Sequence, residues 1–476
     1  MKLTSENRKI IKVLISICLL FFVLMGYLTY FGLFRGPKYV LSSYNRRQQL
    51  EEEKVLRGSI FDRNGIVLAK SEIKNERQER VYPYGNVYSQ VIGYNSRVYG
   101  RSLLELTYNS YLLGTDEYSK VLNVFNISGD GMKSGNNLYT TLDHNLQQYG
   151  ENLLKEKKGA IAAINPKTGE VLALVSKPDY NPDEKSLETH WQDMAESEDS
   201  PFLPRATRGL YAPGSTYKVA TAALAVENGL ADEIFEDKGK VVIDGKVFSN
   251  DNEQAHGKIG LADALTLSSN VVYSQLGVKL GENKLRDMAS RMGLNREIPF
   301  DIPLAKSLFS YDQMGKTDMA AVGIGQGKLL VSPLQMALIA SAIANKGIMM
   351  EPMLVSKVAS LKGTVIRENK PAELSRVMEE ETAEAVGRMM QQVVEKGTGK
   401  NAAVKGVKVA GKTGTAENEL SAKEKNKAHA WFIGYAPVED PVIAIAVLLE
   451  YEGRSGGSVA APIAGKMMGE YLKNLK

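Results

Sequence analysis

One uncharged run near the N-terminus constrains the fold of this chain more than any other feature. From Val13 to Phe34 the sequence has 22 residues without a charge, rich in leucine, isoleucine, valine and phenylalanine. An α-helix of that length covers about 33 Å, which is enough to cross a lipid bilayer. A cleaved signal peptide is the alternative, but the run is long and no small-x-small cleavage site follows it. We therefore predict a retained membrane-spanning helix over residues 13–34.

The charges that precede this run predict its orientation. Residues 1–12 contain four basic side chains and one acidic side chain, namely Lys2, Arg8, Lys9, Lys12 and Glu6. Because excess positive charge favours the cytoplasmic side, we expect these residues to form a short cytoplasmic tail. No later segment reaches about 18 uncharged apolar residues. The rest of the chain is therefore predicted to lie outside the cytoplasm, as the body of a single-pass protein of the cell membrane.

The composition argues against several kinds of function. The 59 basic and 55 acidic residues give a net charge of +4, which is too balanced to indicate a nucleic-acid surface. Cys18, inside the apolar run, is the only cysteine, so the rest of the chain can form neither a disulfide nor a thiolate metal site. The four histidines are scattered without metal-ligand spacing. We expect no bound metal, no cofactor and no nucleic-acid partner.

The pattern of apolar residues predicts two parts after the membrane helix. Residues 35–152 are polar and irregular, with a helix-like stem over residues 42–53 and a hairpin turn at Asn64-Gly65. Beyond them, strands are predicted at 160–165, 170–176, 407–415, 430–435 and 442–449, and helices at 215–228, 261–280, 332–345 and the C-terminal end. Strands, then helices, then strands that rejoin the first pair indicate an α+β layer around one antiparallel sheet.

A serine and a lysine three residues apart provide a candidate nucleophile and its base. In PGSTYK, residues 213–218, a Pro-Gly turn opens a helix, and one helical turn places the Ser215 hydroxyl and the Lys218 amine on the same face. The helix N-terminus favours negative charge on the serine oxygen, and burial can lower the lysine pKa enough for it to accept the serine proton. The spacing alone is weak support, because Ser71 and Lys74 share it. Ser215 could then be only an N-cap, and Lys218 a surface residue.

Two further motifs accompany this pair. The Ser-Ser-Asn motif of residues 268–270 lies in a predicted helical stretch, and the Lys-Thr-Gly-Thr motif of residues 412–415 lies in a predicted strand. Another Lys-Thr-Gly, at residues 167–169, falls in a predicted hairpin turn, and the other Ser-x-Asn copies precede residue 153. Only these two motifs and the serine-lysine pair stand beside strong helices or strands in one domain. Their order and context predict a common site.

The Lys-Thr-Gly-Thr motif has a second interpretation. GVKVAGKT, residues 406–413, fits the phosphate-loop pattern G-x-x-x-x-G-K-[ST]. A phosphate loop needs a helix that opens at the Lys-Thr pair, whereas Gly414 disfavours a helix and the preceding VKVA is typical of a strand. The space outside the cytoplasm also offers little nucleotide. The sequence therefore favours a strand that lines an acyl-transfer site, with nucleotide binding as the alternative.

Taken together, these motifs resemble those of class B penicillin-binding proteins, which are single-pass D,D-transpeptidases that cross-link peptidoglycan. RGSIFDRNGIVLA (57–69) and GRSLLELTYNSYLLG (100–114) are similar to the linking part of that family, with Leu104 where the family usually has glycine. PGSTYK, SSN, GIGQG, SPLQMA and AGKTGTAE are similar to blocks of its catalytic part.

The resemblance covers nearly the whole chain and implies its domain organisation. It implies a compact member with an α+β, penicillin-binding/serine β-lactamase-like transpeptidase fold, in which helices flank an antiparallel sheet. The implied parts are a cytoplasmic tail (1–12), a transmembrane helix (13–34), a linking or dimerisation-type pedestal domain (35–152) and a transpeptidase domain (153–476).

The same resemblance implies the chemistry of the nucleophile. Ser215 would attack the carbonyl carbon between the two terminal D-alanines of a stem peptide, with Lys218 as its general base, and form an acyl-enzyme. Ser268 would relay a proton to the departing D-alanine, and Asn270 would hold the substrate amide and orient Lys218. An amine of a neighbouring stem peptide would then take the acyl group. β-Lactams, which imitate the D-alanyl-D-alanine end, would trap Ser215.

The strand motif is implied to bind the substrate. Lys412 would make the pocket electropositive, while Thr413 and Thr415 would offer hydroxyls to the terminal carboxylate. Gly414 would leave room for a peptide that lies along the strand edge. The backbone amides of Ser215 and Thr415 would form an oxyanion hole.

Membership in this family would also imply partners, and it leaves alternatives open. The expected partners are peptidoglycan stem peptides, β-lactam antibiotics and a polytopic glycan polymerase in the same membrane. A β-lactamase or a penicillin-sensing receptor would share the motifs, and a non-catalytic cell-wall scaffold would share the fold. The retained anchor and the linking part favour the transpeptidase. The sequence does not distinguish roles in cell division, cell shape and sporulation.

Overall fold

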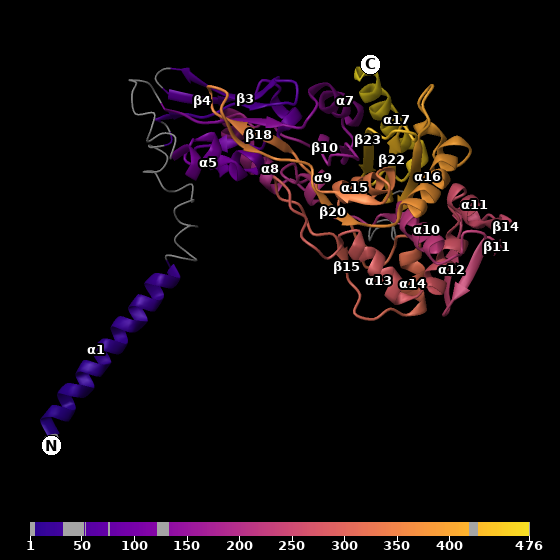
Figure 1. Cartoon of the computed structure of the whole chain (residues 1–476), viewed down its shortest axis with the longest axis horizontal. Helices are drawn as coiled ribbons and strands as arrows, with labels where there is room; N and C mark the ends of the chain where they lie inside the picture. The colour runs from indigo at the N-terminus through magenta and orange to yellow at the C-terminus, as the bar shows by residue number, and fades with distance from the viewer. Residues whose placement is uncertain are drawn as a thin grey trace.

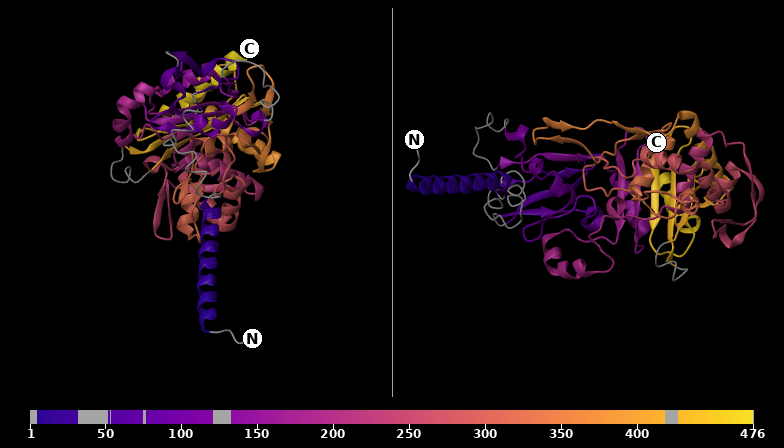
Figure 2. Two further views of the ribbon diagram at one scale, coloured as in Figure 1. Left: turned by 90° about the vertical axis from the view of Figure 1, so that its left-hand side faces the viewer. Right: turned by 90° about the horizontal axis from the view of Figure 1, so that it is seen from below.

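The structure is a computed structural model that describes residues 5–31, 52, 54–74, 77–120, 133–417 and 427–475. Within these ranges the chain forms an N-terminal helix, a linking domain around a six-stranded sheet and a larger C-terminal domain around a five-stranded sheet. Figure 1 shows the helix extending away from the two domains, which lie side by side. The views in Figure 2 show the same arrangement.

The N-terminal helix, α1, spans Ser5–Tyr30 and contains the predicted apolar run as far as Tyr30. Among the described residues it is the one helix that is long and apolar enough to cross a membrane, over Ile11–Tyr30, and its side chains there are exposed. Apolar side chains around a whole exposed helix are unfavourable in water and favourable in lipid. This helix therefore fits a single-pass membrane anchor. Residues 32–34 of the predicted span and, apart from Glu52, the predicted stem helix over residues 42–53 lie outside the described residues.

A five-stranded antiparallel sheet forms the centre of the C-terminal domain. Its strands are β9 (Gly159–Ile164), β10 (Val171–Lys177), β21 (Ala410–Ala416), β22 (His429–Ala436) and β23 (Ile443–Leu449), in the order β10-β9-β23-β22-β21. Each overlaps a strand predicted from the sequence, and the late strands rejoin the first pair because β23 pairs with β9. The last strand in the order, β21, pairs with β22 on one side, and no described strand lies on its other side. β21 is thus an edge strand.

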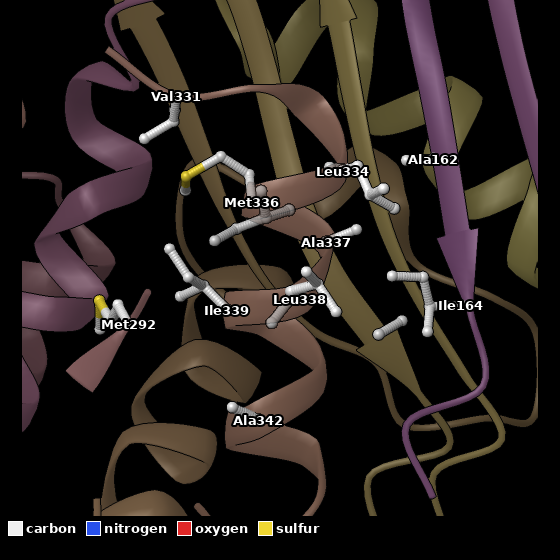
Figure 3. Packing of buried hydrophobic residues seen from close by; sticks show 14 of the residues in the cluster. Ala162, Ile164, Met292, Val331, Leu334, Met336, Ala337, Leu338, Ile339 and Ala342 are labelled. Atoms are coloured by element: carbon white, nitrogen blue, oxygen red, sulfur yellow. The ribbon is translucent and has the colours of Figure 1, made fainter. Parts of the chain in front are cut away.

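The sheet is buried on both faces, which explains why β9 and β23 are apolar throughout. Successive residues point to opposite faces, so Ile164 of β9 meets one hydrophobic core and Ile161 meets another. Three helices cover these faces: α15 (Pro333–Ala344) lies on the first, and α7 (His144–Leu154) and α17 (Gly456–Asn474) lie on the second. Figure 3 shows Leu334 of α15 beside Ala162 and Leu338 beside Ile164. α15 itself is buried on all sides, so it is apolar all round.

The remaining elements of the C-terminal domain are helices and two-stranded ribbons outside the main sheet. The helices are α8 (Glu184–Glu196), α9 (Arg205–Arg208), η3 (Gly214–Tyr217), α10 (Lys218–Glu227), η4 (Asp251–Glu253), α11 (Leu261–Thr266), α12 (Asn270–Leu280), α13 (Glu282–Arg291), α14 (Lys316–Gly323), α16 (Glu380–Glu395) and η5 (Lys400–Ala402). The ribbons pair β11 (Ile234–Asp237) with β14 (Gly257–Gly260), β12 (Lys240–Ile243) with β13 (Lys246–Ser249), β15 (Leu308–Phe309) with β16 (Leu329–Leu330), and β17 (Ile348–Met350) with β20 (Glu373–Arg376).

The helix predicted over residues 261–280 is broken in the structure. It consists of α11 and α12, which a turn at residues 267–269 separates. Ser268 lies in the left-handed region with a φ of 59°, and the Ser269 hydroxyl accepts a hydrogen bond from the Val272 amide at 3.1 Å as the N-cap of α12. The prediction of one continuous helix is therefore wrong, because serine side chains favour caps and turns over helix interiors. The break places Ser268 on a turn.

The linking domain is built from two distant parts of the sequence. Its sheet has the order β19-β18-β8-β2-β3-β4, with β2 (Ile60–Phe61), β3 (Val67–Lys74), β4 (Arg77–Val81), β8 (Asn137–Thr140), β18 (Val355–Ala359) and β19 (Val365–Glu368). Asn64-Gly65 joins β2 to β3 as the predicted hairpin. β18 and β19 follow most of the C-terminal domain in sequence, yet β18 pairs with β8, and Figure 1 shows this orange segment reaching into the violet domain. Strands from both parts of the chain therefore complete one sheet.

The smaller elements of the linking domain surround a buried ionic cluster. They are β1 (Val55–Leu56), η2 (Gly85–Tyr88), β5 (Asn95–Ser96), β6 (Gly100–Arg101), α4 (Leu103–Thr107), α5 (Asn109–Leu112) and β7 (Lys133–Ser134). The Glu105 carboxylate accepts hydrogen bonds from Arg57 Nε and Arg80 Nε, each at 2.7 Å. Burial alone would raise the pKa of Glu105, but the charges of Arg80 and Arg57 outweigh it and hold that pKa below its ordinary value.

Candidate active site

Three segments that are distant in sequence meet beside β21. The start of α10 contributes Lys218, the turn before α12 contributes Ser268, and β21 contributes Lys412. Lys412 Nζ donates a hydrogen bond to Ser268 Oγ at 2.9 Å, and Lys218 Nζ lies 3.3 Å from the same oxygen. The Ser268 hydroxyl therefore lies between two amines, and the structure brings one residue of each predicted motif into a single cluster.

Ser215 lies one turn before Lys218 on a 3₁₀ helix. It is the second residue of η3, and Lys218 is the first residue of α10. Side chains at positions i and i+3 eclipse in a 3₁₀ helix, so these two point in the same direction. This alignment is closer than that of the α-helical turn expected from the sequence. Ser215 is half-buried and Lys218 fully buried, so the hydroxyl can be reached from solvent while the amine lies behind it.

The hydrogen bonds of Lys218 prepare its amine to accept a proton. Its Nζ donates to the Ser268 carbonyl oxygen and to Asn270 Oδ1, both at 2.7 Å. A neutral amine carries two N–H groups, and these two acceptors, which are nearer than the Ser268 hydroxyl at 3.3 Å, can use both. The lone pair of the nitrogen is then left for a hydroxyl proton, which is the requirement for a general base. Asn270 is itself held by its side-chain amide, which donates to the Ser249 carbonyl oxygen at 2.8 Å.

Burial changes the proton affinity of both lysines. Burial is the main cause that lowers the pKa of Lys218 well below 10.5; the charge of Lys412 lowers it further, and the Asp237 carboxylate opposes the shift. Burial also lowers the pKa of Lys412 to about 7. Because two adjacent amines repel each other when both are charged, protonation of one disfavours protonation of the other. Both burial and the charge of Lys412 therefore favour the neutral form of Lys218.

The Lys-Thr-Gly-Thr motif forms the middle of the edge strand β21. Lys412 and Thr413 are buried, whereas Thr415 is exposed. The hydroxyl oxygens of Thr413 and Thr398 lie 2.6 Å apart, so a second threonine from the loop after α16 joins the motif. An extended peptide could add to the unpaired edge of such a strand. Lys412, Thr413 and Thr415 thus offer one amine and two hydroxyls along that edge.

Gly414 allows β21 to lie against the loop that carries the nucleophile. A Cβ atom at position 414 would lie 2.9 Å from Thr216 Cγ2 and 3.1 Å from the Trp431 Cβ. Trp431 also donates its indole N–H to the Ala212 carbonyl oxygen at 3.1 Å. The protein's own packing therefore requires glycine here, in addition to the room for a substrate that the sequence suggested.

The nucleophile loop is held between the GIGQG loop and the end of β21. The Gly214 amide donates to the Gly325 carbonyl oxygen at 2.9 Å. A Cβ atom on Gly214 would lie 2.9 Å from the Thr415 carbonyl oxygen, which shows how closely the loop approaches the strand. These contacts place Gly214, the residue before Ser215, against the backbone of Thr415.

The structure removes the phosphate-loop interpretation. β21 runs as a strand from Ala410 through Lys412 and Thr413 to Ala416, so no helix opens at the Lys-Thr pair. The other candidate motifs also lie elsewhere. Ser71 and Lys74 are on β3, where side chains three residues apart point to opposite faces, and residues 167–169 form the turn between β9 and β10.

Several residues that position the site were not found from the sequence. Thr398 follows α16 in a short Gly-Thr-Gly stretch, Asn250 accepts a hydrogen bond from the Asn270 amide at 2.8 Å, and Asp237 bonds to Asn250 and Ser269. The Gly-Thr-Gly stretch was a weak sequence signal for Thr398. The local sequence gave no signal for Asn250 and Asp237, because their partners become neighbours only when the ribbons β11–β14 and β12–β13 fold against α12.

The fold and the site together define a serine-lysine transpeptidase of the penicillin-binding type, with a membrane helix and a linking domain before it. Residues 159–469 match the family described as "Penicillin binding protein transpeptidase domain". Residues 57–138 match the family described as "Penicillin binding protein A dimerisation domain". The chain belongs to the penicillin-binding protein transpeptidase family, and its two matched domains make it a class B member.

Related proteins resemble it over most of their length. Peptidoglycan D,D-transpeptidase PbpA of Mycolicibacterium smegmatis is 31% identical over 96% of this chain and 97% of its own length. PbpA of Mycobacterium tuberculosis is 33% identical over 88% of this chain and 89% of its own length. Among solved structures, the imipenem acyl-enzyme complex of penicillin-binding protein A from M. tuberculosis has a TM-score of 0.84 at 30% identity and covers 89% of this chain and 100% of its own.

Proposed function

We propose that this protein is a peptidoglycan D,D-transpeptidase that cross-links stem peptides through an acyl-enzyme on Ser215. One observation carries the proposal: amines at 2.9 and 3.3 Å flank the Ser268 hydroxyl, and one of them belongs to Lys218, one 3₁₀ turn after Ser215. Family membership supports the same reaction, because relatives are named peptidoglycan D,D-transpeptidases and solved neighbours are β-lactam acyl-enzyme complexes.

Acylation begins with Ser215 and Lys218. The Ser215 oxygen attacks the carbonyl carbon between the terminal D-alanines while its proton passes to the neutral Lys218 amine. The amides of Ser215 and Thr415 stabilise the oxyanion, an interaction that typically contributes about 100-fold or more in rate per donor. When the C–N bond breaks, Ser268 passes its proton to the departing D-alanine nitrogen and takes up the proton that Lys218 accepted from Ser215, since Lys218 Nζ lies 3.3 Å from the Ser268 oxygen. Its position between two amines allows it to accept a hydrogen bond from Lys412 while it donates its own proton.

The edge of β21 selects the substrate by its terminal carboxylate. Protonated Lys412 provides the positive potential, and the hydroxyls of Thr413 and Thr415 donate hydrogen bonds to the carboxylate oxygens. Asn270 has its side-chain amide beside the cleft and orients both the substrate amide and Lys218. In the second half-reaction an amine of a neighbouring stem peptide attacks the acyl carbon, and Ser215 regains its proton.

A labelling experiment tests this assignment. Full-length protein in detergent is treated with a fluorescent penicillin, and the adduct is located by mass spectrometry after digestion. We expect stable labelling of the parent on Ser215 and none of Ser215→Ala, while Ser71→Ala, which alters the other Ser-x-x-Lys, labels like the parent. Labelling of Ser215→Ala at the parental rate would contradict the assignment.

The same experiment separates the alternative functions. A β-lactamase would release hydrolysed penicillin quickly, so the label would be lost within seconds to minutes. A non-catalytic scaffold would remain unlabelled although folded. A long-lived adduct with both D-alanine release and dimer formation from a stem-pentapeptide substrate is expected only for the transpeptidase.

We also propose a position and a partner in the membrane. α1 would cross the membrane once with its N-terminus in the cytoplasm, since basic residues precede the apolar run. The linking domain would then lie between the membrane and the active site. A polytopic glycan polymerase that contacts α1 and the linking domain would supply the strands that this site cross-links. Protease accessibility of the C-terminal domain in sealed vesicles tests the orientation, and co-purification after crosslinking tests the partner.

A further inference from the structure

A buried carboxylate lies behind the serine-asparagine turn of the active site. Asp237, the last residue of β11, is only 1% exposed. Its oxygens accept hydrogen bonds from the Gly239 amide at 2.9 Å, from the Asn250 side-chain amide at 2.8 Å to each oxygen, and from the Ser269 hydroxyl at 2.7 Å. Four donated hydrogen bonds therefore converge on this buried carboxyl group.

No basic side chain of the described residues forms an ion pair with Asp237. Burying a charge is costly, and most buried charges have a nearby opposite charge. The charge of Asp237 acts on Lys218: it favours the protonated form of that lysine. The fold therefore keeps a buried carboxylate whose electrostatic partner is the proposed general base.

Two asparagines connect the carboxylate to the lysine. Asn250 donates to Asp237 through its side-chain nitrogen and accepts, through Oδ1, from the Asn270 amide at 2.8 Å. Asn270 Oδ1 in turn accepts from Lys218 Nζ at 2.7 Å. The route from Asp237 to Lys218 thus runs through the Asn250 side chain to the backbone amide of Asn270, and from there through the Asn270 side chain to the amine. Asp237 and Asn250 are buried and Asn270 is half-buried, so these hydrogen bonds hold the Lys218 amine in a fixed position.

We propose that Asp237 is a positioning residue for acyl transfer: its charge stabilises the ammonium that forms on Lys218 when Ser215 loses its proton. The inference rests on the proposed function of the Ser215 site. In this reaction Lys218 starts neutral and becomes charged beside Lys412, and both side chains are fully buried. A fixed negative charge behind it offsets that repulsion in the transition state without reorganising, which is the way preorganised charges accelerate reactions.

The groups that face Lys218 set the sign of the expected pH effect. These are Lys412 from β21, Asp237 from β11 and the ring of Tyr273 from α12, with Lys218 Nζ 5.6 Å from the ring centroid. Lys218 must be neutral in the free enzyme, so the acid side of the pH profile for acylation follows its apparent pKa. Removing the charge of Asp237 disfavours the ammonium and shifts this limb to lower pH. The same change weakens the base and lowers the maximal rate.

The test compares acylation kinetics of full-length protein in detergent over a range of pH. For Asp237→Asn we expect the acid limb of the second-order acylation rate with fluorescent penicillin to move down by about half a pH unit or more, and its maximum to fall roughly tenfold. The control is Asp251→Asn, which removes an exposed carboxylate from the neighbouring turn and should leave both unchanged. An acid limb that stays in place in a folded Asp237→Asn protein would overturn the proposal.

A second variant covers the case in which Asp237→Asn does not fold. Exchanging the two side chains in Asp237→Asn/Asn250→Asp keeps one carboxylate and one amide but moves the charge to the position that contacts Asn270, one step nearer to Lys218 along the hydrogen-bonded route. We expect the acid limb to move to higher pH, opposite to the single variant. Unfolding of both variants would assign Asp237 to the fold alone and overturn the proposal. Failure of the parent to form a Ser215 adduct would instead contradict the proposed function.

Discussion

The contact between the GIGQG loop and the nucleophile loop predicts a large effect of one methyl group. Gly325 has a φ of +75°, and its carbonyl oxygen accepts the Gly214 amide at 2.9 Å. In Gly325→Ala the new Cβ would lie 2.0 Å from the Gly214 carbonyl oxygen and 2.8 Å from the Tyr217 Cβ. Ordinary contacts between such atoms begin near 3.4 Å, so the two loops must separate by roughly 1 Å or more. Neither obstacle is the flexible end of a side chain, so the backbone has to move.

The displacement falls on the residue that precedes Ser215. Misplacing a reacting group by about 1 Å commonly costs on the order of 100-fold in rate, so we expect penicillin acylation to fall by about that factor. The unfavourable φ adds about 1–2 kcal/mol of destabilisation, and a weakened hydrogen bond adds about 1 kcal/mol. The free energy of unfolding should therefore fall by roughly 2–3 kcal/mol, a loss that leaves the protein folded.

Gly229→Ala provides the matched control for backbone strain. Gly229 also has a positive φ, +70°, but no atom lies within 4 Å of the position its Cβ would take. This variant should lose stability to a similar extent while its acylation rate stays within about twofold of the parent, because only strain and no steric overlap is added. Stopped-flow acylation with fluorescent penicillin and thermal unfolding would be measured on all three proteins. If Gly325→Ala acylates as fast as Gly229→Ala, the proposed fit between the two loops is wrong.

Two further substitutions test the buried charges. In Lys412→Met we expect acylation to be lost but the unfolding temperature at pH 7 to rise. Folding lowers the pKa of Lys412 from 10.5 to about 7, and below pH 7 this shift destabilises the folded state by up to about 5 kcal/mol, a cost that methionine removes. The added stability of Lys412→Met should shrink as the pH rises from 7 to 10.5. A variant that is no more stable than the parent at pH 7 would refute this reasoning. The Glu105→Gln substitution removes the buried partner of Arg57 and Arg80. We expect the free energy of unfolding to fall by about 3–5 kcal/mol and the acylation rate of the folded protein to stay unchanged. Glu72→Gln, at an exposed ion pair, is the control and should melt like the parent.

The spacing of apolar residues and the preferences of turn and capping residues predicted the main helices and strands of the fold. All five strands of the central sheet overlap predicted ones, because strands buried on both faces need continuous apolar residues. The Asn64-Gly65 hairpin formed as expected. At α15 the Ser332 hydroxyl accepts from the Gln335 amide at 3.1 Å, as a capping box requires, but the Gln335 side chain donates to the Met292 carbonyl oxygen instead. The contact with Met292 thus takes the place of the bond that the Gln335 side chain would make to the Ser332 backbone in a complete capping box.

The parts that the sequence did not predict depend on contacts between distant residues. The break at Ser268 occurs inside a stretch whose apolar pattern continues from α11 into α12, so periodicity alone predicted one helix. The pairing of β18 with β8 joins residues about 215 positions apart, for example Val355 with Thr140, and no local signal marks it. Asp237 looks like a turn residue at the end of a short polar strand, and its role is visible only beside Ser269.

The shared sheet has a consequence for how the two domains can move relative to each other. β18 pairs with β8, and β8 pairs with β2, so strands from the C-terminal half of the chain continue the sheet of the linking domain. Backbone hydrogen bonds of this kind do not permit hinge motion at that junction in the way that a flexible linker would. A force or partner that moves the linking domain therefore moves the C-terminal domain with it. The position of Ser215 relative to the linking domain is then set by the sheet.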